Sequence, residues 1–130
     1  PLAQTGGRVG GGQMVAIMPE GSRSFLLAVA RWSRLTGGAE LQAGIQIMPG
    51  NPLTVALRGT GLTAINEKYR PGFRLPAVPA LKEEASLVLP RGWFQPERVV
   101  EIFTDRQTRL RLGELLGQGP DFERVGFTRL

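Results

Sequence analysis

The sequence contains no cysteine and no histidine. Disulfides, thiolate nucleophiles and zinc sites built from sulfur are therefore excluded, and cysteine usage leaves the redox compartment open. Without imidazole there is no Ser-His-Asp or Cys-His machinery, so catalysis would depend on carboxylates, lysine or arginine alone. We therefore expect a protein that is not an enzyme, with no catalytic residue, no metal site and no cofactor.

Lysine is also scarce, although the chain is basic. Fourteen arginines and two lysines oppose 11 acidic residues, which gives a formal net charge of +5. The guanidinium group of arginine donates paired hydrogen bonds to phosphate oxygens, so this excess of positive charge is compatible with an anion-binding surface. The arginines are spread along the chain, however, and form no dense run typical of a nucleic-acid patch. We favour the explanation that a GC-rich bacterial genome encodes arginine, alanine and glycine frequently.

Long apolar runs are absent. No segment approaches the roughly 18 apolar residues that a membrane span requires. Residues 1–12 lack the charged start and long apolar stretch of a secretory signal, so we expect a soluble, cytoplasmic protein with no membrane partner. The chain begins with Pro1, and we expect it to be a fragment of a longer protein. Its 130 residues suit one domain or two very small ones.

Short β-type segments alternate with turn residues along most of the chain. Apolar and mostly polar residues alternate strictly over 41–48, which is typical of a strand with one buried face. Together with the run FLLAVARW at 25–32 and glycines at 37 and 38, this pattern predicts a β-hairpin over residues 25–48. Further strands are expected at 13–18, 53–58, 85–90, 98–103, 108–116 and 123–130, although residues 112–116 also fit a helix.

This succession of short strands predicts an all-β fold. We expect a small antiparallel β-barrel over residues 10–58, followed by a second small β unit over 81–130. The segment 59–80 is rich in proline and glycine and has no sustained period. We therefore interpret it as an ordered connection without a predicted strand.

Five residues are candidates for ligand binding. Trp32 lies between Arg31 and Arg34, and such an arrangement can stack a base on the indole while the guanidinium groups hold phosphate. The structural alternative, which we favour, is that Trp32 covers the open end of the barrel. Arg70 and Arg74 form a pair at a spacing of four, which random placement of the arginines also produces.

Three other features have structural interpretations. The glycine-rich segment 5–14 lacks the lysine and serine or threonine of a phosphate-binding loop, so we interpret it as a flexible leading segment. Glu83 and Glu84 would point to opposite faces of a strand and could not act together as acid and base. Trp93 and Phe94 follow a Pro-Arg-Gly turn and are expected to plug the space between sheets.

Residues 10–58 resemble the second half of a PilZ domain. The resemblance rests on the segment GQMVAI, on the strand LLAVARW that ends in arginine and tryptophan, on a glycine-containing turn, and on LQAGIQI with its central glycine. PilZ domains are bacterial cytoplasmic β-barrels, many of which bind the second messenger cyclic di-GMP. The resemblance therefore implies a regulatory receptor or adaptor, with cyclic di-GMP as its small ligand and a protein as its partner.

The ligand motifs of the PilZ family are not reproduced in their usual order. In that family an arginine pair and then an Asp/Asn-x-Ser-x-x-Gly motif precede the region matched here, whereas Arg70 and Arg74 follow it and residues 1–12 contain no match to the second motif. Two other functions therefore remain open. One is an interaction domain of a larger protein with no small ligand; the other, less favoured, is a small barrel that binds nucleic acid through its arginines.

Overall fold

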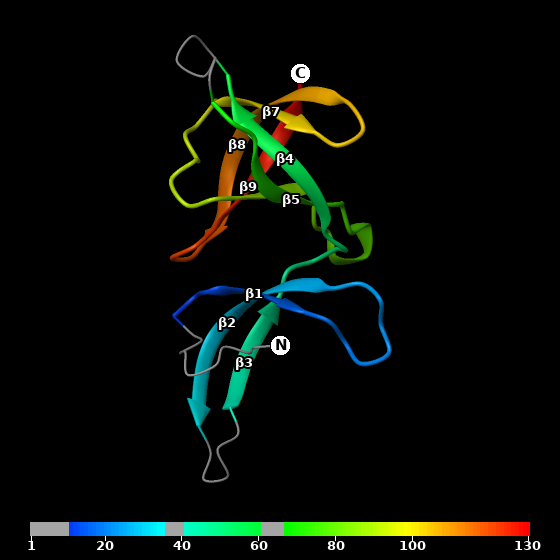
Figure 1. The fold of residues 1–130 in the computed structure, drawn as a ribbon, viewed down its shortest axis with the longest axis vertical. Helices are drawn as coiled ribbons and strands as arrows, with labels where there is room; N and C mark the ends of the chain where they lie inside the picture. Colours follow the sequence, from blue (N-terminus) through cyan, green and yellow to red (C-terminus); the bar gives the residue numbers. More distant parts are fainter. Residues whose placement is uncertain (1–10, 36–40, 61–66) are drawn as a thin grey trace.

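The computed structural model describes residues 11–35, 41–60 and 67–130, and this part of the chain is all-β (Figure 1). Three strands, β1 (Met14–Ile17), β2 (Leu26–Leu35) and β3 (Leu41–Ile47), form an antiparallel sheet in that order. Six more close into an antiparallel barrel in the order β4-β5-β6-β9-β8-β7. They are β4 (Leu53–Gly59), β5 (Arg70–Leu75), β6 (Ser86–Leu89), β7 (Val99–Phe103), β8 (Gln107–Gln118) and β9 (Glu123–Arg129).

The predicted fold class is confirmed, and helix is limited to one 3-10 turn, η2 (Pro79–Leu81), within the described ranges. No helix in this part of the chain is long and apolar enough to cross a membrane. Residues 112–116, which fitted either helix or strand, lie in β8.

The order of the two units differs from the sequence prediction. The closed barrel begins at Leu53, whereas the strand pattern placed a barrel at residues 10–58. Most of that segment instead forms the three-stranded sheet.

Strand β5 lies within the segment 59–80, where no strand was predicted. Pro71 and Gly72 interrupt its pattern, but Gly72 is required because a Cβ there would overlap Leu57 Cδ1 inside the barrel.

The hairpin predicted over 25–48 is confirmed by the antiparallel pairing of β2 with β3. Ala28 lies opposite Ile47 and Ala30 opposite Ile45, and a bulge between Ala30 and Trp32 shifts the register. The turn glycines expected at 37 and 38, and most of the glycine-rich segment 5–14, lie outside the described residues.

Alternating residues of β4, β6, β7, β8 and β9 fill the barrel with a buried apolar core, to which Trp93 is added from the connection between β6 and β7. Trp93 is buried in this core and Phe94 packs against it. Both are structural residues, as expected, but they fill the interior of the barrel and do not lie between two sheets. The burial of each leucine or valine side chain contributes about 1.5–3 kcal/mol. The core consists of Val55, Leu57, Leu87, Leu89, Trp93, Val100, Ile102, Leu110, Leu112 and Val125.

Two buried carboxylates are held by specific hydrogen bonds. Glu123 accepts hydrogen bonds from the backbone N–H groups of Gly92, at 3.0 Å, and Phe94, at 2.7 Å, and so fixes the turn before β7. Glu101 accepts one from Arg58 at 2.8 Å, and this bond raises the pKa of the Arg58 guanidinium above its ordinary value. These hydrogen bonds offset the cost of removing both carboxylates from water.

A second apolar cluster joins the three-stranded sheet to the barrel, and we call it the seam. Its buried residues are Leu27, Val29 and Met48 on the sheet side and Leu75, Val88 and Phe122 on the barrel side. The rings of Phe25 and Phe73 meet across it edge to face, with centroids 5.9 Å apart. The sheet and the barrel therefore share one continuous apolar interface.

Close contacts of the main chain also hold the sheet against the barrel. The Met14 N–H donates to Asp121 Oδ1 at 3.0 Å. Beside it, Gly12 approaches Gly119 so closely that a Cβ on Gly119 would overlap Gly12 O. In the connection between β3 and β4, Gly50 has φ of +92°, and a Cβ there would lie 2.9 Å from Pro76 O. The glycines are therefore needed for close approach of the sheet to the barrel.

Replacement of Gly119 tests this close approach. A Gly119→Ala substitution places a methyl group against Gly12 O and the Phe122 ring, and we expect it to lower the free energy of unfolding by about 1–3 kcal/mol. Gly117→Ala is the matched control on the same hairpin, because nothing lies within 4 Å of its Cβ position. Urea denaturation measures both, and equal stabilities of the two variants would contradict the packing at the seam.

Replacement of Glu123 tests how much its hydrogen bonds to Gly92 and Phe94 stabilise the protein. The Glu123→Gln side chain retains one acceptor oxygen and turns an amide N–H toward the second backbone donor, so we expect a loss of about 1–3 kcal/mol in unfolding free energy. Glu114→Gln, at an exposed position of β8, removes the same charge and serves as the control. A thermal melt in which both variants match the parent chain would show that the Glu123 bonds contribute nothing.

Candidate functional site

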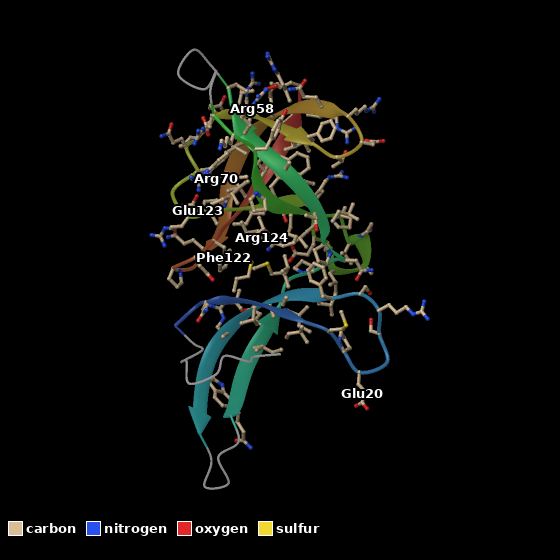
Figure 2. The ribbon with its side chains drawn as sticks, in the orientation of Figure 1. Glu20, Arg58, Arg70, Phe122, Glu123 and Arg124 are labelled. Atoms are coloured by element: carbon tan, nitrogen blue, oxygen red, sulfur yellow. The ribbon has the colours of Figure 1, made fainter. Side chains whose placement is uncertain are left out.

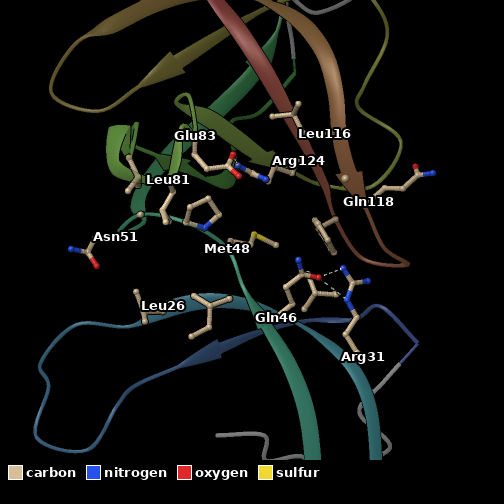
Figure 3. A pocket seen from close by; sticks show the side chains of 17 residues that line it. Leu26, Arg31, Gln46, Met48, Asn51, Leu81, Glu83, Leu116, Gln118 and Arg124 are labelled. Carbon is tan, nitrogen blue, oxygen red and sulfur yellow. Dashed lines mark hydrogen bonds and ion pairs between the residues drawn. The ribbon is translucent and has the colours of Figure 1, made fainter.

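A cavity of about 640 Å³ lies along the seam, between the three-stranded sheet and the barrel (Figure 3). Strands β2 and β3 and the connection to β4 line one side, and η2 with the β8–β9 hairpin lines the other. The volume falls within the range of about 300–1,000 Å³ that is usual for small-molecule sites. This seam cavity is the strongest candidate site.

Two arginines line the seam cavity from opposite units. Arg31 is exposed on β2 and donates from Nε and Nη2 to Gln46 Oε1, at 3.0 and 2.5 Å. Arg124 projects from β9, donates from Nε to Ser86 Oγ at 3.0 Å, and lies 3.3 Å from Glu83 Oε2. Within the described residues no carboxylate lies within ion-pair distance of Arg31. Its charge is therefore available to an anion.

The remaining wall of the seam cavity combines apolar and amide groups. Val29, Met48 and Phe122 belong to the buried cluster of the seam and supply apolar surface. Figure 3 places Met48 in the middle of the view, with Asn51 and Gln118 at opposite sides. Such a wall can cover a flat ring while its amides and arginines bond to polar edges.

Trp32 lies on the three-stranded sheet, and not at an open end of the barrel. Its indole covers Gly44 of β3, because a Cβ on Gly44 would overlap Trp32 Nε1. About half of the side chain is exposed. The covering role predicted for Trp32 therefore applies to a glycine of the neighbouring strand. Arg34 pairs with Gln42 in the same hairpin, and its side chain lies outside the described part of the structure.

The structure does not bring Arg70 and Arg74 to the seam cavity. Both belong to β5 of the barrel, and neither lines that cavity. Arg70 is exposed opposite Leu57, above the seam in Figure 2. Arg74 lies with its Cζ 5.8 Å from the centre of the Phe127 ring. The predicted binding residues thus divide between two regions of the molecule.

Several residues of the seam cavity gave no signal in the sequence. Arg124 is one of many dispersed arginines, and its position depends on the pairing of β9 with β6. Asn51 lies between Gly50 and Pro52, and such a sequence indicates only a turn. Phe122 lies in the hairpin before β9, where no strand pattern marks it as a contact with β2. Each of these depends on tertiary contacts.

The barrel corresponds to a known family. The model of the FimW C-terminal beta-barrel domain matches residues 55–130, which begin inside β4 and include β5–β9. The matched region is therefore the closed barrel, without the three-stranded sheet. No curated protein and no solved structure matches the chain. Since the match spans more than half of its residues, this chain belongs to the FimW C-terminal β-barrel domain family.

Proposed function

We propose that this chain is a non-catalytic regulatory module that binds cyclic di-GMP in the seam cavity. Membership in a family of small β-barrel domains supports a regulatory or accessory role. The resemblance of residues 10–58 to a bacterial cytoplasmic family of cyclic di-GMP receptors supports the ligand and a cytoplasmic location. The observation that carries the proposal is the approach of Arg31 and Arg124 to one cavity from opposite units.

The chemistry of the cavity suits a guanine dinucleotide. Cyclic di-GMP carries two phosphodiester groups and two guanine bases, and arginine binds both phosphate oxygens and the O6 and N7 edge of guanine with paired donors. Arg31 can exchange its neutral Gln46 partner for such a group at little electrostatic cost. Met48 and Val29 provide apolar surface for the faces of the bases.

The position of the cavity explains how binding would regulate. A ligand held by Arg31 on β2 and Arg124 on β9 contacts both the sheet and the barrel. Such a ligand stabilises the arrangement in which the two are packed together, by its differential affinity for that arrangement. A protein partner that recognises the packed form would then bind more tightly when the ligand is present.

A second function, that of a protein-interaction module without a small ligand, is favoured by the outer edge of β3, which pairs with no further strand in the part of the chain that the structure describes. This strand lies at the edge of its sheet and carries no charged residue. Ile45 and Ile47 are 38% and 51% exposed. Because the Met48 N–H bonds to Leu27 O, hydrogen-bonding alternation turns the backbone groups of both isoleucines outward. An extended segment of a partner could pair there.

Isothermal titration calorimetry with cyclic di-GMP tests the leading proposal. We expect saturable binding to the parent chain and an affinity at least about tenfold weaker for Arg31→Ala, because a charge-assisted hydrogen bond contributes about 1.5–3 kcal/mol. Arg23→Ala, which removes an exposed arginine in the β1–β2 connection away from the cavity, is the matched control and should bind as the parent does.

Three outcomes separate the functions. Absence of heat with cyclic di-GMP for the parent chain would refute the receptor proposal and leave the interaction module. Equal affinities of the Arg31→Ala and Arg23→Ala variants for cyclic di-GMP would show that the ligand does not bind in the seam cavity. Salt-sensitive binding of RNA or DNA oligonucleotides that both variants weaken alike would support a nucleic-acid binder.

A further inference from the structure

Three arginines that do not line the seam cavity gather at one end of the barrel. Arg74 and Arg129 line two neighbouring cavities of about 690 and 430 Å³, and Arg106 lines the smaller one. This end includes the start of β4, because Leu53 pairs with Arg74, and the turn between β7 and β8. In Figure 1 that turn lies on the opposite side of the barrel from the loop that joins β6 to β7.

Strand register explains why arginines occupy this end, which we call the barrel mouth. Arg129 lies opposite Leu110, and Phe127 opposite Leu112, and both leucines are buried in the barrel core. Paired residues of antiparallel strands share a face. Arg129 therefore continues the inward-facing row of β9 at the point where the barrel opens.

Among the described residues, no ion pair neutralises these arginines. The ion pairs of the described residues involve other arginines, namely Arg58, Arg91, Arg111 and Arg124. The smaller cavity contains one carboxylate, that of Asp105, which accepts a hydrogen bond from Thr104 Oγ1 at 3.0 Å. That bond lowers the pKa of Asp105, so its charge is −1 at neutral pH. The larger cavity is also lined by Lys82, Glu83 and Glu84. In the smaller cavity, three guanidinium groups face one carboxylate, which leaves that cavity positive.

We propose that the barrel mouth binds a phosphate group carried by a small molecule. Guanidinium groups bind phosphate oxygens with paired hydrogen bonds. The hydroxyl group of Thr108 lines the smaller cavity and can donate to a further oxygen, whereas that of Thr104 already donates to Asp105. Arg74 is positioned for this role because its guanidinium lies over the Phe127 ring, which limits the side-chain entropy lost on binding.

The shape of the mouth favours a small ligand over nucleic acid. A cavity of about 430 Å³ with Ile102 at its wall encloses one compact molecule. A nucleic-acid strand would instead need a basic stripe with stacking aromatic residues along a face of the barrel. None of the three arginines lines the seam cavity, so this site is distinct from the one proposed for cyclic di-GMP.

Titration of inorganic pyrophosphate into the ¹⁵N-labelled chain, followed by NMR at constant ionic strength, tests this site. We expect saturable shifts confined to residues 104–108 and to the Nε–H groups of Arg74, Arg106 and Arg129. Arg74→Ala should weaken binding at least about tenfold. Arg106→Ala, in an exposed turn where unfolding is not a concern, should weaken it as well.

The controls distinguish this site from the seam cavity and from general charge attraction. Arg23→Ala removes the same charge elsewhere and should bind pyrophosphate as the parent does. Shifts that fail to saturate, that spread over arginines throughout the chain, or that decrease equally in all three variants would overturn the proposal. Arg74→Ala should leave the response to cyclic di-GMP unchanged, so failure at one site is separable from failure at the other.

Discussion

The seam between the three-stranded sheet and the barrel is the interaction on which the rest of the structure depends. An isolated three-stranded sheet buries little apolar surface, and here Leu27 and Val29 become buried only by packing on Leu75, Val88 and Phe122. The same packing brings Arg31 close to the cavity that Arg124 lines from the barrel. Stability and the candidate ligand site therefore have one physical origin.

The barrel and the three-stranded sheet differ in whether their strand edges are paired. In the barrel, β4 pairs with both β5 and β7, so neither side of this strand is exposed. The sheet instead ends at β3, whose uncharged edge lacks the lysine or proline that usually prevents pairing with other chains. The closed unit thus supplies rigidity, and the open unit supplies the surface most suited to a partner.

The sequence predicted local features well and long-range pairing poorly. Alternation in LQAGIQI correctly indicated β3 and its hairpin with β2. Nothing in LTVALR, however, distinguishes pairing with β3 from pairing with β5 and β7, so the barrel was assigned to the wrong half of the chain. Arg31 was identified beside a tryptophan, whereas Arg124 depends on contacts with Ser86 and Glu83, which are distant in sequence.

Nuclear Overhauser effects report whether the sheet and the barrel are in contact. In the full chain with ¹³C-labelled methyl groups, the Met48 Cε and Val29 methyl groups should show cross-peaks to the Phe122 ring. These should persist at temperatures up to a single cooperative unfolding transition. Absence of these cross-peaks, with sheet and barrel resonances that relax at different rates, would contradict the account.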